Sequence, residues 1–115
     1  MDGKYTYSPV IEITVTKPKS FELMQNYPNP FNPSTQIRYA LGHSGHVTLE
    51  IFNVLGQRVK TLTNEFQPIG TYSAEWDGRN DSGMLLATGV YFYRVHVASN
   101  NETVFTRSNK MILMK

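Results

Sequence analysis

The sequence predicts an all-β protein, an antiparallel β-sandwich of about seven strands. The 115 residues are enough for one ordinary domain with a buried core. No part of the chain sustains the periodicity of an amphipathic helix, whereas short alternating segments are separated by turn residues about every eight to twelve positions. Seven Tyr and six Phe contribute to an aromatic content of 12%, which favours a packed β-protein over disorder.

Composition and charge argue against several classes of function. The net charge of +2, from 11 basic and 9 acidic residues, is small and scattered, so no nucleic-acid surface is expected. Cysteine is absent, which excludes a disulfide framework, thiol catalysis and a cysteine zinc site. No apolar stretch has membrane-spanning length, and we expect no membrane insertion. Because the N-terminus lacks a signal-peptide pattern, we expect this chain to be the tail of a longer protein whose export signal lies upstream.

The first strand-like stretch comprises residues 5–16, in which apolar and polar side chains alternate as in a half-buried strand. Pro9 marks an edge or a break within it, and residues 17–20 form a short polar linker. We therefore divide the chain into residues 1–20, the end of a preceding β-domain, and residues 21–115, the main domain. The alternatives are that the first strand belongs to the main domain or pairs with an edge of a second copy.

Residues 26–35, which we call the proline segment, contain half of the six prolines of the chain. Each proline fixes its own φ angle, disfavours a helical conformation of the preceding residue and lacks a backbone donor. We expect neither a helix nor a central strand here, but a stiff, extended lead-in whose asparagines replace backbone partners at bends. Tyr27 and Phe31 are its large apolar side chains, and at least one of them is expected to anchor it to the β-domain.

Alternation predicts the remaining strands in order: residues 21–25, 36–41, 47–52, 58–63, 71–76, 90–99, 103–108 and the terminal strand 110–115. Residues 53–56 form a tight hairpin connection, in which Gly56 is available for positive φ. The other connections are expected at residues 42–45, 64–70, 77–83 and 100–102, and residues 84–86 are short and apolar.

The motifs of this chain resemble a known family. Asn-Tyr-Pro-Asn-Pro-Phe-Asn-Pro-Ser-Thr at residues 26–35 is similar to the opening of the type A C-terminal sorting domain of the type IX secretion system. Those domains end large secreted proteins of Bacteroidetes-type bacteria and are related to the Ig-like domain of flagellar hook-capping proteins. Further motifs match in order and spacing at residues 52–59, 70–72, 76–78, 81–83, 87–94 and 110–115. The resemblance covers residues 21–115 and implies an Ig-like β-sandwich.

Most of the matching positions have a structural interpretation. Glycines stand where turns need them, at Gly56, Gly70, Gly78, Gly83 and Gly89. The motif aromatics are expected in the core, since aromatic side chains bury the largest apolar area, and they are Trp76, Tyr91 and Tyr93. The alternative is that exposed Tyr and Trp side chains stack on sugars.

The polar turn at residues 77–83 resembles part of a calcium loop, because Asp77, Asn80 and Asp81 are closely spaced oxygen donors. It lacks the third acid and the bidentate Glu of an EF-hand, so turns closed by Asn and Asp side chains are the better interpretation. Glu75 and Asp77 also flank Trp76 in the manner of paired glycosidase carboxylates. A sandwich this small has no room for a long cleft, and we interpret them as surface acids.

The three histidines do not predict a metal site. His43 and His46 lie three positions apart in a Gly/Ser-rich stretch, His96 is isolated on a strand, and no third ligand is placed by the sequence. No serine-nucleophile or phosphate-loop motif is present. We predict no catalytic residues, no metal and no cofactor.

The resemblance implies that the domain directs an upstream cargo domain of the same chain across the outer membrane through the type IX secretion machinery. It further implies transit through the periplasm, removal by a sortase-like protease, and cargo that is secreted or attached to the cell surface. Cleavage would then fall at residues 16–20, since exposed linkers are accessible to proteases. Candidates for contact with the machinery are Asn26, Tyr27, Pro28, Asn29, Pro30, Phe31, Asn32, Pro33, Lys110, Met111, Ile112, Leu113, Met114 and Lys115. The alternatives are a carbohydrate-binding or adhesive module and a scaffold that self-associates through a strand edge.

Overall fold

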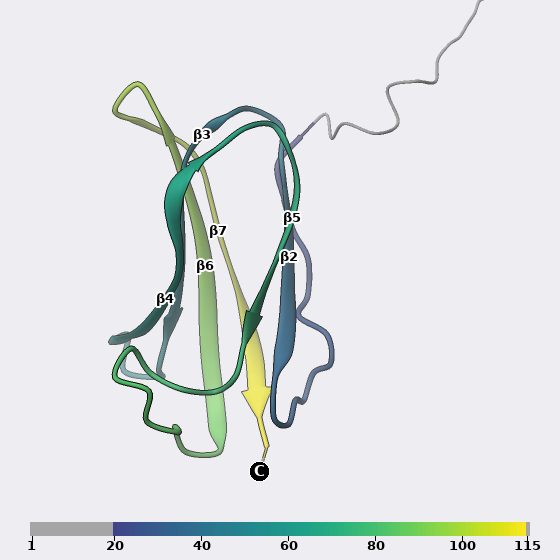
Figure 1. The fold of residues 1–115 in the computed structure, drawn as a ribbon, viewed down its shortest axis with the longest axis vertical. Coiled ribbons are helices and arrows are strands. Elements are labelled where there is room, and N and C mark those ends of the chain that lie inside the picture. Colours follow the sequence, from purple (N-terminus) through teal and green to yellow (C-terminus); the bar gives the residue numbers. More distant parts are fainter. Residues whose placement is uncertain (1–19, 115) are drawn as a thin grey trace, which may run out of the picture.

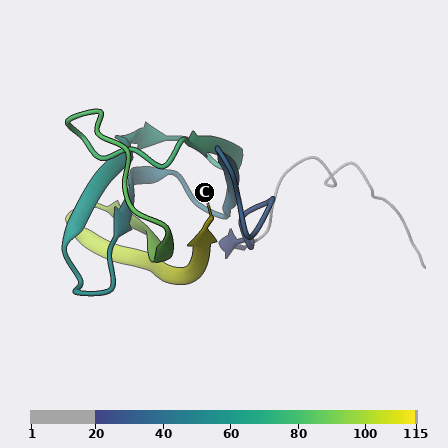
Figure 2. The same ribbon diagram turned by 90° about the horizontal axis from the view of Figure 1, so that it is seen from below.

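A computed structural model describes residues 20–114 (Figure 1). The predicted strand at residues 5–16, most of the predicted cleavage linker and Lys115 lie outside the described residues. The described chain forms seven strands in two antiparallel sheets packed face to face (Figures 1 and 2). This confirms the predicted all-β sandwich. Residues 20–114 include no helix that is long and apolar enough to cross a membrane.

The two sheets differ in size. The three-stranded sheet has the order β1-β2-β5, with β1 at Glu22–Leu23, β2 at Thr35–Leu41 and β5 at Gly70–Trp76. The four-stranded sheet has the order β4-β3-β6-β7, with β3 at Gly45–Phe52, β4 at Arg58–Gln67, β6 at Gly89–Ser99 and β7 at Glu102–Leu113. The chain changes sheet three times, after β2, β4 and β5.

Alternation along the strands places one row of apolar side chains from each sheet in the space between the sheets. Strand β3 shows the pattern most clearly, because Val47, Leu49 and Ile51 are fully buried while the residues between them are not. The largest fully buried side chains are Trp76, Tyr39, Tyr93 and Phe31. The motif aromatics Trp76, Tyr91 and Tyr93 are therefore core residues, as the sequence predicted.

Several predicted strand boundaries are wrong, among them the start of β3, which lies at Gly45. Strand β4 continues to Gln67, four residues beyond the predicted end. The polar residues Asn64 and Glu65, which suggested a loop, pair with Thr48 and Val47 of β3. The predicted strands 103–108 and 110–115 form the single strand β7, whose pairing with β6 continues through Asn109 opposite Tyr93.

The five glycines expected at turns all have positive φ angles. Gly56 closes the hairpin between β3 and β4 with φ = 82°, where its N–H donates to the Asn53 carbonyl oxygen at 3.0 Å. Only glycine adopts this backbone conformation without a steric cost. The hairpin predicted at residues 53–56 is therefore present.

Candidate functional site

The proline segment and the end of β7, proposed separately as recognition sites, lie side by side in the structure (Figure 2). Phe31 forms a parallel bridge with Leu113. Its N–H donates to the Ile112 carbonyl oxygen, and its own carbonyl oxygen accepts from the Met114 N–H, both at 3.0 Å. The two stretches thus form one surface at one end of the domain, which we call the composite edge (residues 26–33 and 110–114).

Side-chain amides complete the pairing that the prolines cannot make. The N–H of Ile112 donates to Asn29 Oδ1 at 3.0 Å, and Gln25 Nε2 donates to the Lys110 carbonyl oxygen at 2.9 Å. Because proline lacks a backbone donor, an asparagine side chain takes the place of a backbone partner here. The sequence analysis expected this use of asparagine at bends, but it did not identify β7 as the partner.

A buried asparagine closes the proline segment on itself. Asn26 is 2% exposed, and its Nδ2 donates to Thr35 Oγ1 at 2.9 Å and to the Pro28 carbonyl oxygen at 3.1 Å. The Thr35 hydroxyl, also buried, donates to the same carbonyl at 2.8 Å. The backbone of Tyr27 pairs with Gln36 at the start of β2. These bonds fix both ends of the segment, so it is an ordered loop.

Phe31 is the apolar anchor of the proline segment. It is 1% exposed, and its ring centroid lies 5.5 Å from that of Trp76, which in turn lies 5.4 Å from Tyr91. Tyr27, by contrast, is 75% exposed. The expectation that at least one of these two side chains anchors the segment is therefore confirmed for Phe31, whereas Tyr27 is displayed to solvent.

The hydroxyl group of Tyr93 connects this segment to both β6 and β7. It donates to the Met24 carbonyl oxygen at 2.7 Å and accepts from the Asn26 N–H at 2.8 Å and from Asn109 Nδ2 at 3.2 Å. Burial raises the pKa of Tyr93 above its ordinary value, and the hydrogen bonds from Asn109 and Asn26 partly oppose that rise. The phenol therefore stays protonated and can keep donating at neutral pH.

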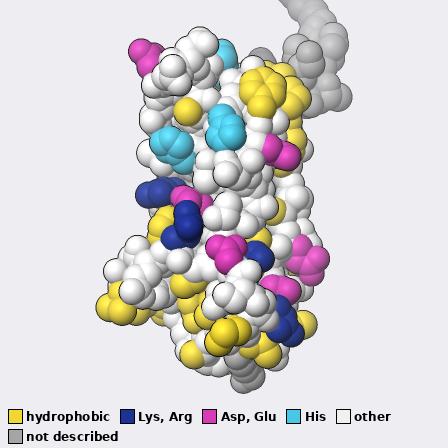
Figure 3. Space-filling view, turned by 60° about the vertical axis from the view of Figure 1, so that its left-hand side comes forward, with side chains coloured by type: hydrophobic (Ala, Val, Ile, Leu, Met, Phe, Trp, Pro, Cys, Tyr) yellow, Lys and Arg dark blue, Asp and Glu magenta, His cyan; other side chains and the backbone are white. Residues whose placement is uncertain are grey.

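The composite edge divides into buried and accessible residues. Asn26, Phe31, Met111 and Leu113 are buried, and Ile112 is half-buried. The exposed side chains, which a partner could contact directly, are Tyr27, Pro28, Asn29, Pro30, Asn32, Pro33, Lys110 and Met114. A pocket of about 160 Å³ adjoins them, lined by Asn32, Pro33, Asp77, Gly78, Leu85 and Leu113. The same end of the domain exposes apolar side chains (Figure 3).

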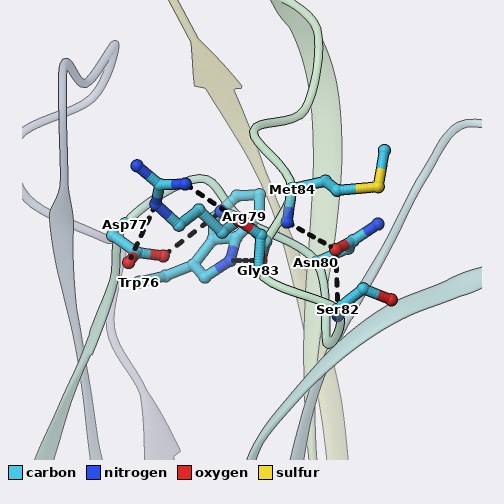
Figure 4. Close-up of polar contacts among 7 residues, drawn as sticks. All are labelled: Trp76, Asp77, Arg79, Asn80, Ser82, Gly83 and Met84. Carbon is cyan, nitrogen blue, oxygen red and sulfur yellow. Dashed lines mark hydrogen bonds and ion pairs between the residues drawn. The ribbon is translucent and has the colours of Figure 1, made fainter.

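The loop between β5 and β6 is organised by its own polar side chains (Figure 4). Asn80 Oδ1 accepts from the backbone N–H groups of Ser82 and Met84 at 3.0 Å, and Asp77 Oδ1 accepts from the Arg79 N–H at 3.2 Å. Trp76 Nε1 donates to the Arg79 carbonyl oxygen at 2.8 Å. These are the bonds expected of turns closed by Asn and Asp side chains. Asp81 reaches further, to the edge of β4.

The remaining polar candidates do not converge on one site. His46 contacts Asn64, and His96 contacts Thr103. Within residues 20–114, no group of three or more His, Asp or Glu side chains is close enough to hold a metal ion. Glu75 and Asp77 are both exposed, and Asp77 forms an ion pair with Arg79 at 3.7 Å.

The sequence analysis missed three contributors to the candidate site. Gln25, Asn109 and the hydroxyl of Tyr93 hold the lead-in against β6 and β7. Asn109 carried a local signal, since a polar residue that interrupts a strand-like pattern often has a buried partner. Gln25 carried none.

Two antiparallel sheets packed around an aromatic core define this chain as an Ig-like β-sandwich module. The profile of the FlgD Ig-like domain matches residues 33–102, which is more than half of the chain. The chain belongs to the FlgD Ig-like domain family.

Solved structures share the fold at low sequence identity. Dimeric latent PorU from Porphyromonas gingivalis superposes with a TM-score of 0.68 and 22% identity over 90% of this chain and 10% of PorU. PorZ from the same organism, described as an essential surface component of the type IX secretion system, gives 0.54 and 19% over 79% of this chain and 11% of PorZ. FlgD from Xanthomonas campestris, described in relation to hook capping, gives 0.55 and 22% over 80% of this chain and 64% of FlgD. The search of curated proteins found no match.

Proposed function

We propose that this chain is a non-catalytic C-terminal sorting module, which directs an attached cargo protein through the type IX secretion system. The observation that carries the proposal is the composite edge. Most of its residues lie outside the part of the chain that matches the FlgD Ig-like domain, residues 33–102. Two stretches, one before and one after the matched region in the sequence, are hydrogen-bonded to each other and present one accessible surface.

Two further observations support this proposal. The motifs along residues 21–115 resemble type A sorting domains, and a surface component of the type IX system has a domain of similar fold. In this proposal the partners are the outer-membrane machinery and a sortase-like protease. The cargo passes through the periplasm and ends outside the cell or on its surface.

The sugar-binding alternative loses its main support. It required the motif aromatics to be exposed, but Trp76 and Tyr93 are fully buried and Tyr91 is 7% exposed. Stacking on a sugar requires an accessible ring face. These three side chains therefore cannot form the expected platform.

Secretion of a reporter tests the proposed function. The 115-residue chain is fused to the C-terminus of a fluorescent protein that carries a signal peptide, and the reporter without the chain is the control. Both are expressed in a bacterium with a working type IX system and in a strain that lacks its translocon. We expect the fusion outside the first strain and in the periplasm of the second, with the control in the periplasm of both. Periplasmic retention of the fusion in both strains would contradict the proposal.

A further inference from the structure

The strand edges of this sandwich are not equally protected. Edge strands expose unpaired backbone groups and invite pairing with another chain, so proteins commonly cover, bend or charge them. Strand β4 has register shifts at two points of its pairing with β3, and Lys60 lies on this edge. Asp81 also covers the N-terminal part of β4. The Asp81 N–H donates to the Val59 carbonyl oxygen at 3.0 Å, and Asp81 Oδ1 accepts from the Thr61 N–H at 3.2 Å.

The edges of β1 and β7 protect each other. The ring of Phe21 stacks on that of Phe105 with 4.9 Å between centroids. Asn109 Nδ2 donates to the Met24 carbonyl oxygen at 3.3 Å, and the proline segment pairs with the end of β7. Strand β1 is only two residues long. These contacts cover the end of β7, and its remaining length carries Arg107 and a register shift in its pairing with β6.

Strand β5 has fewer of these protections, since Glu75 is its only charged residue. Its seven residues pair with β2 without a register shift, and they include no Pro, Lys or Arg. The backbone groups of Gln36 and Arg38 in β2 bond to Tyr27 and Met24, on the side of β2 that faces away from β5. Because successive residues of an antiparallel strand bond to opposite sides, the odd-numbered residues of β2 bond to the even-numbered residues of β5.

The backbone N–H and C=O groups of Thr71, Ser73 and Glu75 therefore lie in the plane of the sheet and point away from β2, toward the open edge. In the part of the chain that the structure describes, no hydrogen bond to these backbone groups is present. Their side chains are exposed, whereas Tyr72 and Ala74 are half-buried at the seam between the sheets. The open edge is thus regular and partly apolar.

We propose that β5 pairs antiparallel with β5 of a second copy of this chain, centred on Ser73. In this register Ser73 lies opposite Ser73, and Thr71 lies opposite Glu75 on both sides of the centre. These three pairs would exchange about six backbone hydrogen bonds, since each bonded pair exchanges two. The two three-stranded sheets would become one continuous sheet of six strands.

The sequence of β5 is self-complementary in this register, which is why a second copy fits the edge. Glu75 is the only charged residue of the strand, and it faces Thr71 rather than the other Glu75. Tyr72 faces Ala74, so a large side chain lies beside a small one on the inner face, where pairing removes both from water. This association goes beyond the proposed sorting function and does not depend on it.

Charge substitutions at Thr71 test both the partner and the register. Sedimentation of the full chain over a concentration series reaching about 1 mM is expected to show reversible dimers. Thr71→Lys places a positive charge opposite each Glu75, and Thr71→Glu places a negative charge there. Two opposed charge pairs are expected to change the dimer dissociation constant by roughly 2- to 30-fold, lower for Thr71→Lys and higher for Thr71→Glu. Thr71→Ser, which adds no charge, is the matched control.

Three results would overturn the proposal. These are a monomer at the highest concentration, a dimer that responds equally to both charges, and a dimer that Ser73→Pro leaves intact. Proline at Ser73 removes the central outward N–H, a position at which an edge strand tolerates proline. Thermal unfolding of each variant shows whether the domain itself is intact.

Discussion

Phe31 is the residue that makes a proline-rich stretch part of the domain. Three prolines remove backbone donors from the segment, so a ladder of hydrogen bonds cannot hold it to the sheet. The Phe31 backbone makes the bridge to β7, and its ring occupies the core beside Trp76. One residue thus supplies both the polar and the apolar attachment.

We expect Phe31→Ala to lower the free energy of unfolding by about 3–5 kcal/mol, because it removes a buried aromatic ring and leaves a cavity. Tyr27→Ala is the matched control, since Tyr27 lies in the same segment and is 75% exposed. Its effect on the free energy of unfolding is expected to stay within about 0.5 kcal/mol. Urea unfolding of both variants measures the difference. Equal destabilisation would show that Phe31 is not the anchor.

Single residues were also where sequence reasoning was strongest. The large apolar area of aromatic side chains predicted Trp76, Tyr91 and Tyr93 in the core, and this prediction is confirmed. Sequence reasoning could not identify the bond between the Tyr93 hydroxyl and the Asn26 N–H. That bond joins residues 67 positions apart, and no local pattern encodes such a separation.

The pairing of strands accounts for two of the errors in the predicted elements. Residues 64–67 continue β4 because β3 offers paired backbone groups along its full length. The side chains of Asn64 and Glu65 are exposed, and the buried Gln67 accepts a hydrogen bond from the Tyr39 hydroxyl at 2.7 Å. Asn109 lies within β7 because Tyr93, its neighbour on β6, accepts its hydrogen bond. In both cases the tertiary partner outweighed the local preference of the sequence.

Gly45 shows how closely two strands of this sheet approach. The sequence analysis placed it in a turn, but it begins β3, and a Cβ atom there would lie 2.7 Å from the Ala98 carbonyl oxygen. We expect Gly45→Ala to destabilise the domain by about 1–3 kcal/mol, because β3 and β6 would have to move apart. His43→Ala, an exposed change in the turn that precedes β3, is the control for urea unfolding. A neutral Gly45→Ala variant would show that β3 and β6 adjust without cost.

The whole molecule consists of a β-sandwich, which we call the frame, and the composite edge at one end of it. The sequence predicted the frame well, because hydrophobic alternation and turn residues specify a sandwich whatever its function. It also identified both stretches of the composite edge. It could not predict their pairing, because the proline segment precedes β2 and its partner lies at the end of β7.

We propose that the accessible part of the composite edge is the sorting signal. The most direct test is secretion of the reporter fusion carrying Tyr27→Ser together with Met114→Ser, two exposed apolar side chains of that surface. Phe66→Ser is the control, because Phe66 is 65% exposed and pairs with His46 at the start of β3, far along the sheet from the composite edge. The account predicts that the double variant folds but remains in the periplasm, whereas the Phe66 variant is secreted. Secretion of both folded variants at the level of the unsubstituted fusion would contradict the account.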